Sequence, residues 1–385
     1  MSVIQHPVWA MAFRPLYPLA AVYGAFSVLL WAFGYQGTVT LPSYFWHAHE
    51  MIWGYAGAVV VAFLLTAVAT WTGQPPTRGK PLLILVVLWL LARIFAFTPF
   101  NAVSGFFGVA FYWLAAVCMG VSVVRSRNSR NYIAVAALFL FGLMHLLFHL
   151  NLSPFNAAAL LNGLLSGLVM VAGFIGLIGT RIISFFTSRR LGTPQVASPM
   201  WLALSALVLP MVAALLMSLQ TALPLASLCS VAAGVIGLVQ TCRWFEKGTL
   251  REPLLWILFA GYTATSIGLI VIGTAYWQPQ IMSTGVHLVA VGGIGMLTVG
   301  MMARTALGHT GRPLYPAPQP MGLAFLLMLA ATVMRTLAAF AATVNATAYN
   351  HSLRLSAALF AASLLLYAWR YTPWLLRPRL DGKAG

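Results

Sequence analysis

Long apolar stretches, separated by short polar or basic connections, repeat along the whole chain. A helix needs roughly 20 residues to cross a hydrocarbon core of about 30 Å, and each stretch is about that long. Because backbone polar groups must be satisfied within the lipid, such stretches predict helices. Twelve are expected, over residues 13–34, 47–70, 81–98, 103–124, 132–150, 156–180, 200–219, 223–244, 254–274, 281–302, 321–342 and 349–371.

The composition agrees with a membrane protein, since 61% of the residues are hydrophobic and 6% are charged. No soluble domain fits between the stretches, so we expect one all-α polytopic bundle over residues 1–385. The first stretch is longer than the apolar core of a usual signal peptide and has no basic run ahead of Arg14. We therefore predict that it is retained as the first transmembrane helix.

Basic residues alternate with base-free connections, as the positive-inside rule requires. Both termini are therefore predicted to be cytoplasmic. The net charge of +17 needs no nucleic-acid partner, because anionic membrane lipid at the inner leaflet accounts for it. The residues expected on the inner side are Arg14, Arg78, Lys80, Arg125, Arg127, Arg130, Arg181, Arg189, Arg190, Arg243, Lys247, Arg251, Arg304, Arg312, Arg370, Arg377, Arg379 and Lys383.

This topology gathers six of the eight histidines on the outer side, on four different helices. Neutral imidazole is the commonest metal ligand in proteins, so the group predicts a haem or metal site. His6 and His309 stay at the inner face, and we expect His6 and His351 to be ordinary interfacial side chains. The predicted metal ligands are His47, His49, His145, His149 and His287.

His145 and His149 are spaced i to i+4, which puts both rings on one helix face. The spacing suits a shared metal, while a supporting role for His145 behind a ligand is the alternative. His47 and His49, by contrast, differ by about 200° on a regular helix and cannot both point at one metal. Either His47 precedes the helix as a cap, or the two residues serve different sites.

Glu50 follows these histidines and is one of only four acidic residues in the chain. A carboxylate in a membrane helix is costly unless it faces an interior site, so we expect a function for it. Three roles are open: a catalytic proton carrier, an ion-pair partner, or an acceptor that fixes an imidazole tautomer. We slightly favour the acceptor role.

Three arginines depart from the charge pattern and are expected in the outer half: Arg93, Arg335 and Arg354. Glu50 is the only carboxylate expected on that side, so the surplus positive charge would suit haem propionates on Arg93 and Arg335. For Arg354, snorkelling to lipid phosphate is an equal alternative. Glycines at 292, 293 and 295 indicate close helix packing, with room for a macrocycle as the alternative.

Several ordered motifs resemble those of the NnrS family of haem- and copper-containing bacterial membrane proteins. They are FRP at 13–15, WHAHEM at 46–51, FLLTAV at 63–68, WTG at 71–73, LGHTGRP at 307–313 and PRLDG at 378–382. The resemblance implies a twelve-helix protein of the bacterial inner membrane that is linked to denitrification and to resistance against nitric oxide. The matching site positions are His47, His49, Glu50, Arg93, His149, Arg181, His287 and the loop around His309.

The chain also departs from the family pattern. Ser184 stands where a proline is expected, and His145 and His351 match no family position that we recognise. The loop around His309 is predicted to face the cytoplasm, about a membrane thickness from the other histidines, so it cannot share their metal. We prefer a structural turn for it over a proton-uptake or partner surface.

These observations favour a haem-dependent oxidoreductase that reduces or scavenges nitric oxide in the outer half of the bilayer, with electrons from an unknown donor. Non-covalent haem b is expected because the chain lacks a C-x-x-C-H motif. His49 and His287 are the first choice of axial ligands, while His47 and His149 would complete an axial pair or hold copper. The alternatives are a non-catalytic haem or copper sensor or delivery factor, and a twelve-helix transporter.

Overall fold

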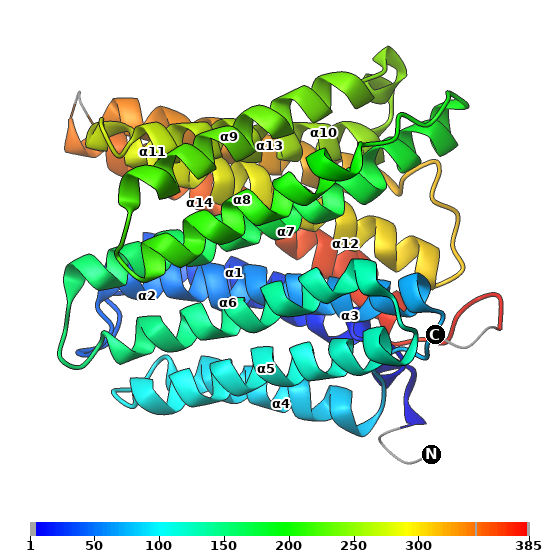
Figure 1. The fold of residues 1–385 in the computed structure, drawn as a ribbon, viewed down its shortest axis with the longest axis horizontal. Coiled ribbons are helices and arrows are strands. Elements are labelled where there is room, and N and C mark those ends of the chain that lie inside the picture. Colours follow the sequence, from blue (N-terminus) through cyan, green and yellow to red (C-terminus); the bar gives the residue numbers. More distant parts are fainter. Residues whose placement is uncertain (1–4, 343–344, 383–385) are drawn as a thin grey trace. The chain divides into compact units, whose positions relative to one another are not determined.

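The structure, a computed structural model, describes residues 5–342 and 345–382, and Lys383 of the predicted inner charges lies outside them. Within these ranges the chain is helical (Figure 1), and two isolated bridges, at 37 with 42 and at 152 with 155, are the only β-type pairings. The expectation of an all-helical polytopic membrane protein is confirmed. Eleven helices of the described residues are long and apolar enough to cross a membrane.

The one predicted stretch that is not among these eleven helices, residues 81–98, forms α4 (Lys80–Phe95), which has 16 residues. At 1.5 Å per residue it is roughly 24 Å long, a little short of the hydrocarbon core. It begins after Gly79 and carries proline in its first turn, where the missing N–H costs no hydrogen bond. The sides on which the two termini lie stay a prediction.

Contacts divide the chain into two compact units. Unit 1 contains Met1–Gly167, Met302–Pro316 and Leu364–Gly385, and unit 2 contains Leu168–Met301 and Ala317–Ser363. This division neither confirms nor contradicts the prediction of a single domain over residues 1–385.

Unit 1 holds the N-terminal helices. α4 packs against α5, α5 packs against α6, and α1 packs against the helix formed by α2, η3 and α3. In Figure 1 the helices α4, α5 and α6 lie side by side, in that order. The bounds are α1 (Phe13–Ala32), α2 (Ser43–His49), η3 (Glu50–Ala56), α3 (Gly57–Thr72), α5 (Asn101–Arg125) and α6 (Tyr132–Leu150).

α7 (Ala157–Leu191) begins in unit 1 and continues into unit 2. In unit 2, α9 packs against α8 and α10, and η7 packs against α10 and α13. The bounds are α8 (Met200–Ser218), α9 (Leu223–Trp244), α10 (Pro253–Thr274), α11 (Met282–His287), η7 (Leu288–Gly295), α12 (Met296–His309), α13 (Gln319–Ala341) and α14 (Ala346–Leu375).

Two of the long helices contain a π-helical segment. η3 (Glu50–Ala56) directly follows His49, and η7 (Leu288–Gly295) directly follows His287. At the end of η3 the N–H of Gly57 donates to the carbonyl of Ile52, the i to i−5 bond of a π-helix. Such segments rotate the side chains that follow them and are frequent at functional sites. Both lie beside a histidine that the sequence singles out.

Candidate metal centre

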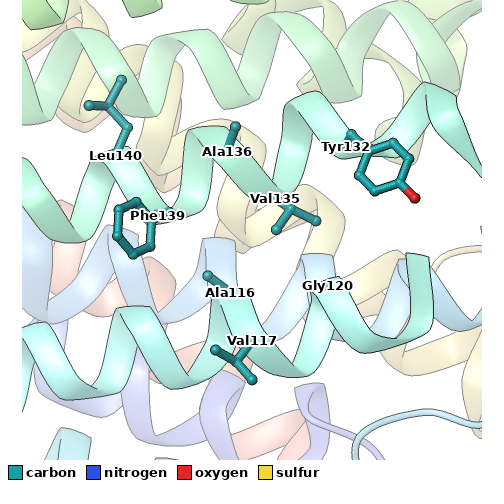
Figure 2. A pocket seen from close by; sticks show the side chains of 8 residues that line it. All are labelled: Ala116, Val117, Gly120, Tyr132, Val135, Ala136, Phe139 and Leu140. Atoms are coloured by element: carbon teal, nitrogen blue, oxygen red, sulfur yellow. The ribbon is translucent and has the colours of Figure 1, made fainter. Parts of the chain in front are cut away.

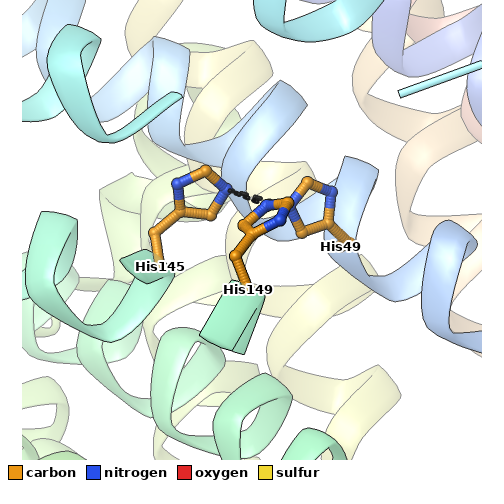
Figure 3. A group of neighbouring side chains, drawn as sticks. All are labelled: His49, His145 and His149. Carbon is orange, nitrogen blue, oxygen red and sulfur yellow. Dashed lines mark hydrogen bonds between the residues drawn. The ribbon is translucent and has the colours of Figure 1, made fainter. Parts of the chain in front are cut away.

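Three histidines of unit 1 lie together. His49 is the last residue of α2, and His145 and His149 lie in the last two turns of α6. Figure 3 shows the three rings turned toward one another from these two helices. His49 and His145 are fully buried, and His149 is partly buried. Of the described residues, these form the one group of three or more metal-binding side chains.

The three Nε2 atoms form a small triangle. His49 Nε2 is 2.9 Å from His145 Nε2 and 3.0 Å from His149 Nε2, and the third edge is 3.2 Å. A ring nitrogen either carries a proton or offers a lone pair. Three nitrogens in mutual contact therefore cannot all be joined by hydrogen bonds, since at least one edge must join two lone pairs or two protons. Protons alone do not satisfy the triangle.

A single cation satisfies it. Metal ions lie about 2.0–2.1 Å from imidazole nitrogens, which spaces the nitrogens of a tetrahedral site roughly 3.3 Å apart. The three edges of 2.9, 3.0 and 3.2 Å are close to that spacing. Three imidazoles on one side of an ion leave a further coordination position open. The residues present therefore fit one metal ion.

The buried carboxylate of Glu50 orients the first of these histidines. His49 Nδ1 donates to Glu50 Oε1 at 2.6 Å, which places the lone pair of the neutral ring on Nε2, inside the triangle. The other carboxylate oxygen accepts from Arg93 Nη1 at 2.5 Å and from the hydroxyl of Tyr23. Glu50 thus combines two of the roles left open by the sequence, the tautomer-fixing acceptor and the ion-pair partner.

Aromatic rings and glycines enclose the site. Trp53, which is fully buried, lies 5.3 Å from the ring of His49 and 5.1 Å from that of His145, centroid to centroid. On α5, Gly105 and Gly108 face His149 and His145, and a Cβ on Gly105 would approach His149 Cγ to 2.6 Å. Hydrogen at these positions is what lets both imidazoles lie against α5.

Gly54 likewise leaves room for the ion pair between Arg93 and Glu50, because a Cβ on Gly54 would lie 2.7 Å from Arg93 Nη1. Arg93, which the sequence offered to haem propionates, therefore has a partner within the chain. Its contact with Glu50 is buried, with side-chain exposures of 5% and 0%. A buried pair of this kind is much more costly to break than to keep.

The structure separates His47 from the group. Its ring stacks on Trp31 with centroids 4.0 Å apart and planes 17° from parallel. Because His47 lies within α2, the cap alternative does not apply, and His47 and His49 point to different surroundings. His145, which the sequence left between ligand and supporting roles, is a full member of the triangle.

His287 and Arg335 belong to unit 2. The Nδ1 of His287 donates to the carbonyl of Ser283 at 2.7 Å, which places its lone pair on Nε2. The glycines of η7 serve helix packing, because a Cβ on Gly292 would lie 2.7 Å from Ala264 Cβ. His309 packs in unit 1 with its ring 5.5 Å from that of Phe13, and the structural role of its loop stays a prediction.

Sequence reasoning missed the roles of Tyr23, Gly105 and Gly108. No local pattern marks them, since each acts on a residue far away in the chain. The i to i+4 spacing of His145 and His149 predicted that both rings lie on one helix face, and in the structure both belong to the triangle.

A separate apolar groove of about 700 Å³ opens between α5 and α6 (Figure 2). Its lining residues are Ala116, Val117, Gly120, Tyr132, Val135, Ala136, Phe139 and Leu140. None of them is a histidine, cysteine or carboxylate, so the groove contributes no ligand to the metal centre.

Fold and site together define a multi-pass helical membrane protein with a buried group of three histidines suited to a metal. The family model described as NnrS protein matches residues 7–379, so the chain belongs to the NnrS family. No curated protein matches the chain significantly.

Proposed function

We propose that His49, His145 and His149 bind one copper ion, and that the protein uses it to handle nitric oxide within the membrane, either by reduction with electrons from an external donor or by scavenging. The observation that carries the proposal is the triangle of Nε2 atoms with edges of 2.9, 3.0 and 3.2 Å. Imidazole ligands suit copper, zinc, iron and nickel alike. Copper is preferred because the family resemblance implies it.

A haem iron does not fit the same three residues. Axial imidazoles bind on opposite faces of the macrocycle, so their nitrogens are roughly 4 Å apart with the ring between them. His49 Nε2 and His145 Nε2 are 2.9 Å apart and leave no space for such a ring. If the protein carries haem, as its family resemblance implies, its ligands must include other residues. His287, whose Nδ1 hydrogen bond to Ser283 leaves a lone pair on Nε2, is our candidate.

The surroundings support a small neutral substrate. The site lies on helices that are apolar enough to cross a membrane, and Trp53 and Phe148 pack against the ring of His49. Nitric oxide is uncharged and soluble in lipid, so it can reach such a site without a polar channel. A copper ion on three imidazoles supplies an open coordination position and one-electron redox chemistry.

The polar residues around the triangle hold its protonation state. Glu50 keeps the proton of His49 on Nδ1, and Arg93 and Tyr23 keep Glu50 in place from the other side. The buried aromatic rings exclude water from the imidazoles, which strengthens these charge-assisted bonds. Glu50 is thus a positioning residue in this proposal, not a group that touches the substrate.

Nitric oxide removal by membrane vesicles tests the proposal. With ascorbate present as the electron donor, vesicles with the wild-type protein should remove added nitric oxide faster than protein-free vesicles, and the H145A variant should lose at least 90% of that difference. H351A is the matched control, because His351 is exposed at the start of α14. Equal rates for H145A and wild type would contradict a role of the triangle in nitric oxide chemistry.

A further inference from the structure

A second charged cluster lies in unit 1, at the end that carries the C-terminal residues. Arg312 and Arg370 both stack on Trp374, with guanidinium carbons 4.4 and 4.1 Å from its ring centroid. The two cations are therefore no further apart than the sum of these distances. Arg377 is also close enough to act electrostatically on Arg312. We call Arg312, Arg370, Arg377 and Trp374 the arginine cluster.

Buried contacts hold this cluster in place. Arg14, whose side chain is fully buried, donates from Nη1 to the carbonyls of Leu375 at 2.9 Å and Arg377 at 2.8 Å. The N–H of Leu380 donates to the carbonyl of Thr310 at 3.2 Å, which ties the C-terminal segment to the end of α12. These bonds fix the backbone that follows Trp374 and carries Arg377.

Among the described residues of unit 1, both acidic side chains already have cationic partners outside the cluster. The acidic residues of unit 1 are Glu50 and Asp381. Glu50 pairs with Arg93, and Asp381 binds Arg379 through two bonds of 2.8 and 2.6 Å. The bonds to Asp381 raise the pKa of Arg379, whereas burial and the charges of Arg370 and Arg377 lower the pKa of Arg312. The like charges of the cluster repel one another.

One donor of the cluster also lacks a partner. Nη1 of Arg312 is shielded from solvent and forms no hydrogen bond among the described residues. A shielded donor of this kind is normally satisfied by water or by a ligand. Planar guanidinium groups that are held together match the oxygens of a phosphate group, to which they bind in bidentate fashion.

We propose that the arginine cluster binds a phosphate group, with Arg312, Arg370 and Arg377 as its cationic ligands and Trp374 as the platform that holds two of them. The phosphate belongs either to the headgroup of an anionic membrane lipid or to a free phosphate species. The site is separate from the three histidines and does not depend on the proposed copper chemistry.

Binding to the purified full-length protein in an uncharged detergent tests this site. The probes are dioctanoyl phosphatidylglycerol, dioctanoyl phosphatidylcholine and inorganic phosphate, each titrated by isothermal calorimetry. The R312Q/R370Q variant removes two cations of the cluster. The control R125Q/R127Q removes two exposed cations at the connection between α5 and α6, with the same change of net charge.

We expect phosphatidylglycerol to bind at least tenfold more weakly to R312Q/R370Q than to wild type, and to change less than twofold in the control. If inorganic phosphate shows the same loss and phosphatidylglycerol binds no more tightly, the source is free phosphate. Equal losses in both variants would overturn the proposal. So would the absence of wild-type binding for both phosphatidylglycerol and inorganic phosphate, or phosphatidylcholine binding that falls equally in R312Q/R370Q and in the control. If R312Q/R370Q is not monodisperse, R312Q alone takes its place, with a loss of at least threefold expected.

Discussion

Glu50 joins His49, a proposed metal ligand, to the cation Arg93 and the hydroxyl of Tyr23. Its carboxylate is fully buried, so the two charges of the ion pair meet in a medium of low dielectric constant. Under these conditions the negative charge of Glu50 keeps the ring proton of His49 on Nδ1. The affinity of the triangle for a metal should therefore depend on Glu50 although Glu50 is not a ligand.

Replacing Glu50 by glutamine tests this dependence. E50Q keeps the shape but removes the negative charge that orients His49, and comparable changes behind metal-bound histidines lower metal affinity about 10–100-fold. We expect a loss in that range, measured by competition with a copper chelator. E246Q, at an exposed glutamate, should leave the affinity unchanged. An unchanged affinity in E50Q would show that Glu50 does not orient the ligand.

The stability of the fold should depend more strongly on Arg93 than the E50Q exchange would show, because removal of the arginine leaves a buried charge without its partner. R93A leaves the carboxylate of Glu50 buried without its partner, a change that typically costs about 3–5 kcal/mol. The thermal unfolding midpoint in detergent should fall markedly in R93A and should be restored in part by R93A/E50Q, which removes both charges. R125A, at an exposed arginine at the end of α5, is the control. Equal midpoints for R93A and R125A would contradict a stabilising ion pair.

For single residues, the sequence predicted which side chains belong to the site better than it predicted which side chains they contact. His49, His145, His149, Glu50 and Arg93 were all singled out, because ionisable groups within apolar helices are rare and costly. The pairing of Arg93 with Glu50 was not predicted over haem propionates, since 43 residues separate the two in the chain. The division between His47 and His49 was predicted, because it depends only on local helix geometry.

Two helices and the glycines of a third determine where the imidazoles lie. α6 presents His145 and His149 on one face, α2 ends at His49, and α5 offers Gly105 and Gly108 as a surface without side chains. The length of the apolar stretches predicted these helices but not the π-helical segment η3. A π-turn inserts one residue without changing composition, so an apolar stretch does not reveal it.

The glycine surface gives a test at this scale. G108A places a methyl group against the ring of His145, and that ring must move to avoid it. We expect a lower copper affinity, by at least tenfold, with helix content unchanged in circular dichroism. G120A on the same helix is the matched control, because its Cβ would meet only Val135 at 3.5 Å. Equal affinities in the two variants would argue against a role for α5 in positioning the ligands.

For the whole molecule, composition and charge pattern predicted the class of fold, because the lipid bilayer restricts a chain of this hydropathy to helices. The division into two compact units was not predicted, since it depends on contacts between distant segments such as 302–316 and the N-terminal helices of unit 1. The membrane orientation rests on the arginine and lysine pattern alone and is open to a direct test.

Fusions to alkaline phosphatase, which is active only after export from the cytoplasm, test that orientation. A fusion after residue 385 should be inactive, because the C-terminus is predicted to be cytoplasmic. A fusion in the connection at residues 151–156, between α6 and α7, should be active. The opposite pattern would place the histidine triangle in the inner half of the membrane.

The central claim is that one metal ion is bound by three imidazoles, and X-ray absorption at the copper edge of the purified protein measures this most directly. The account predicts about one copper per chain with three imidazole nitrogens at about 2.0 Å, and two such nitrogens or no copper in H145A. H351A should match wild type. Copper with sulfur ligands, or a wild-type spectrum that is unchanged in H145A, would contradict it.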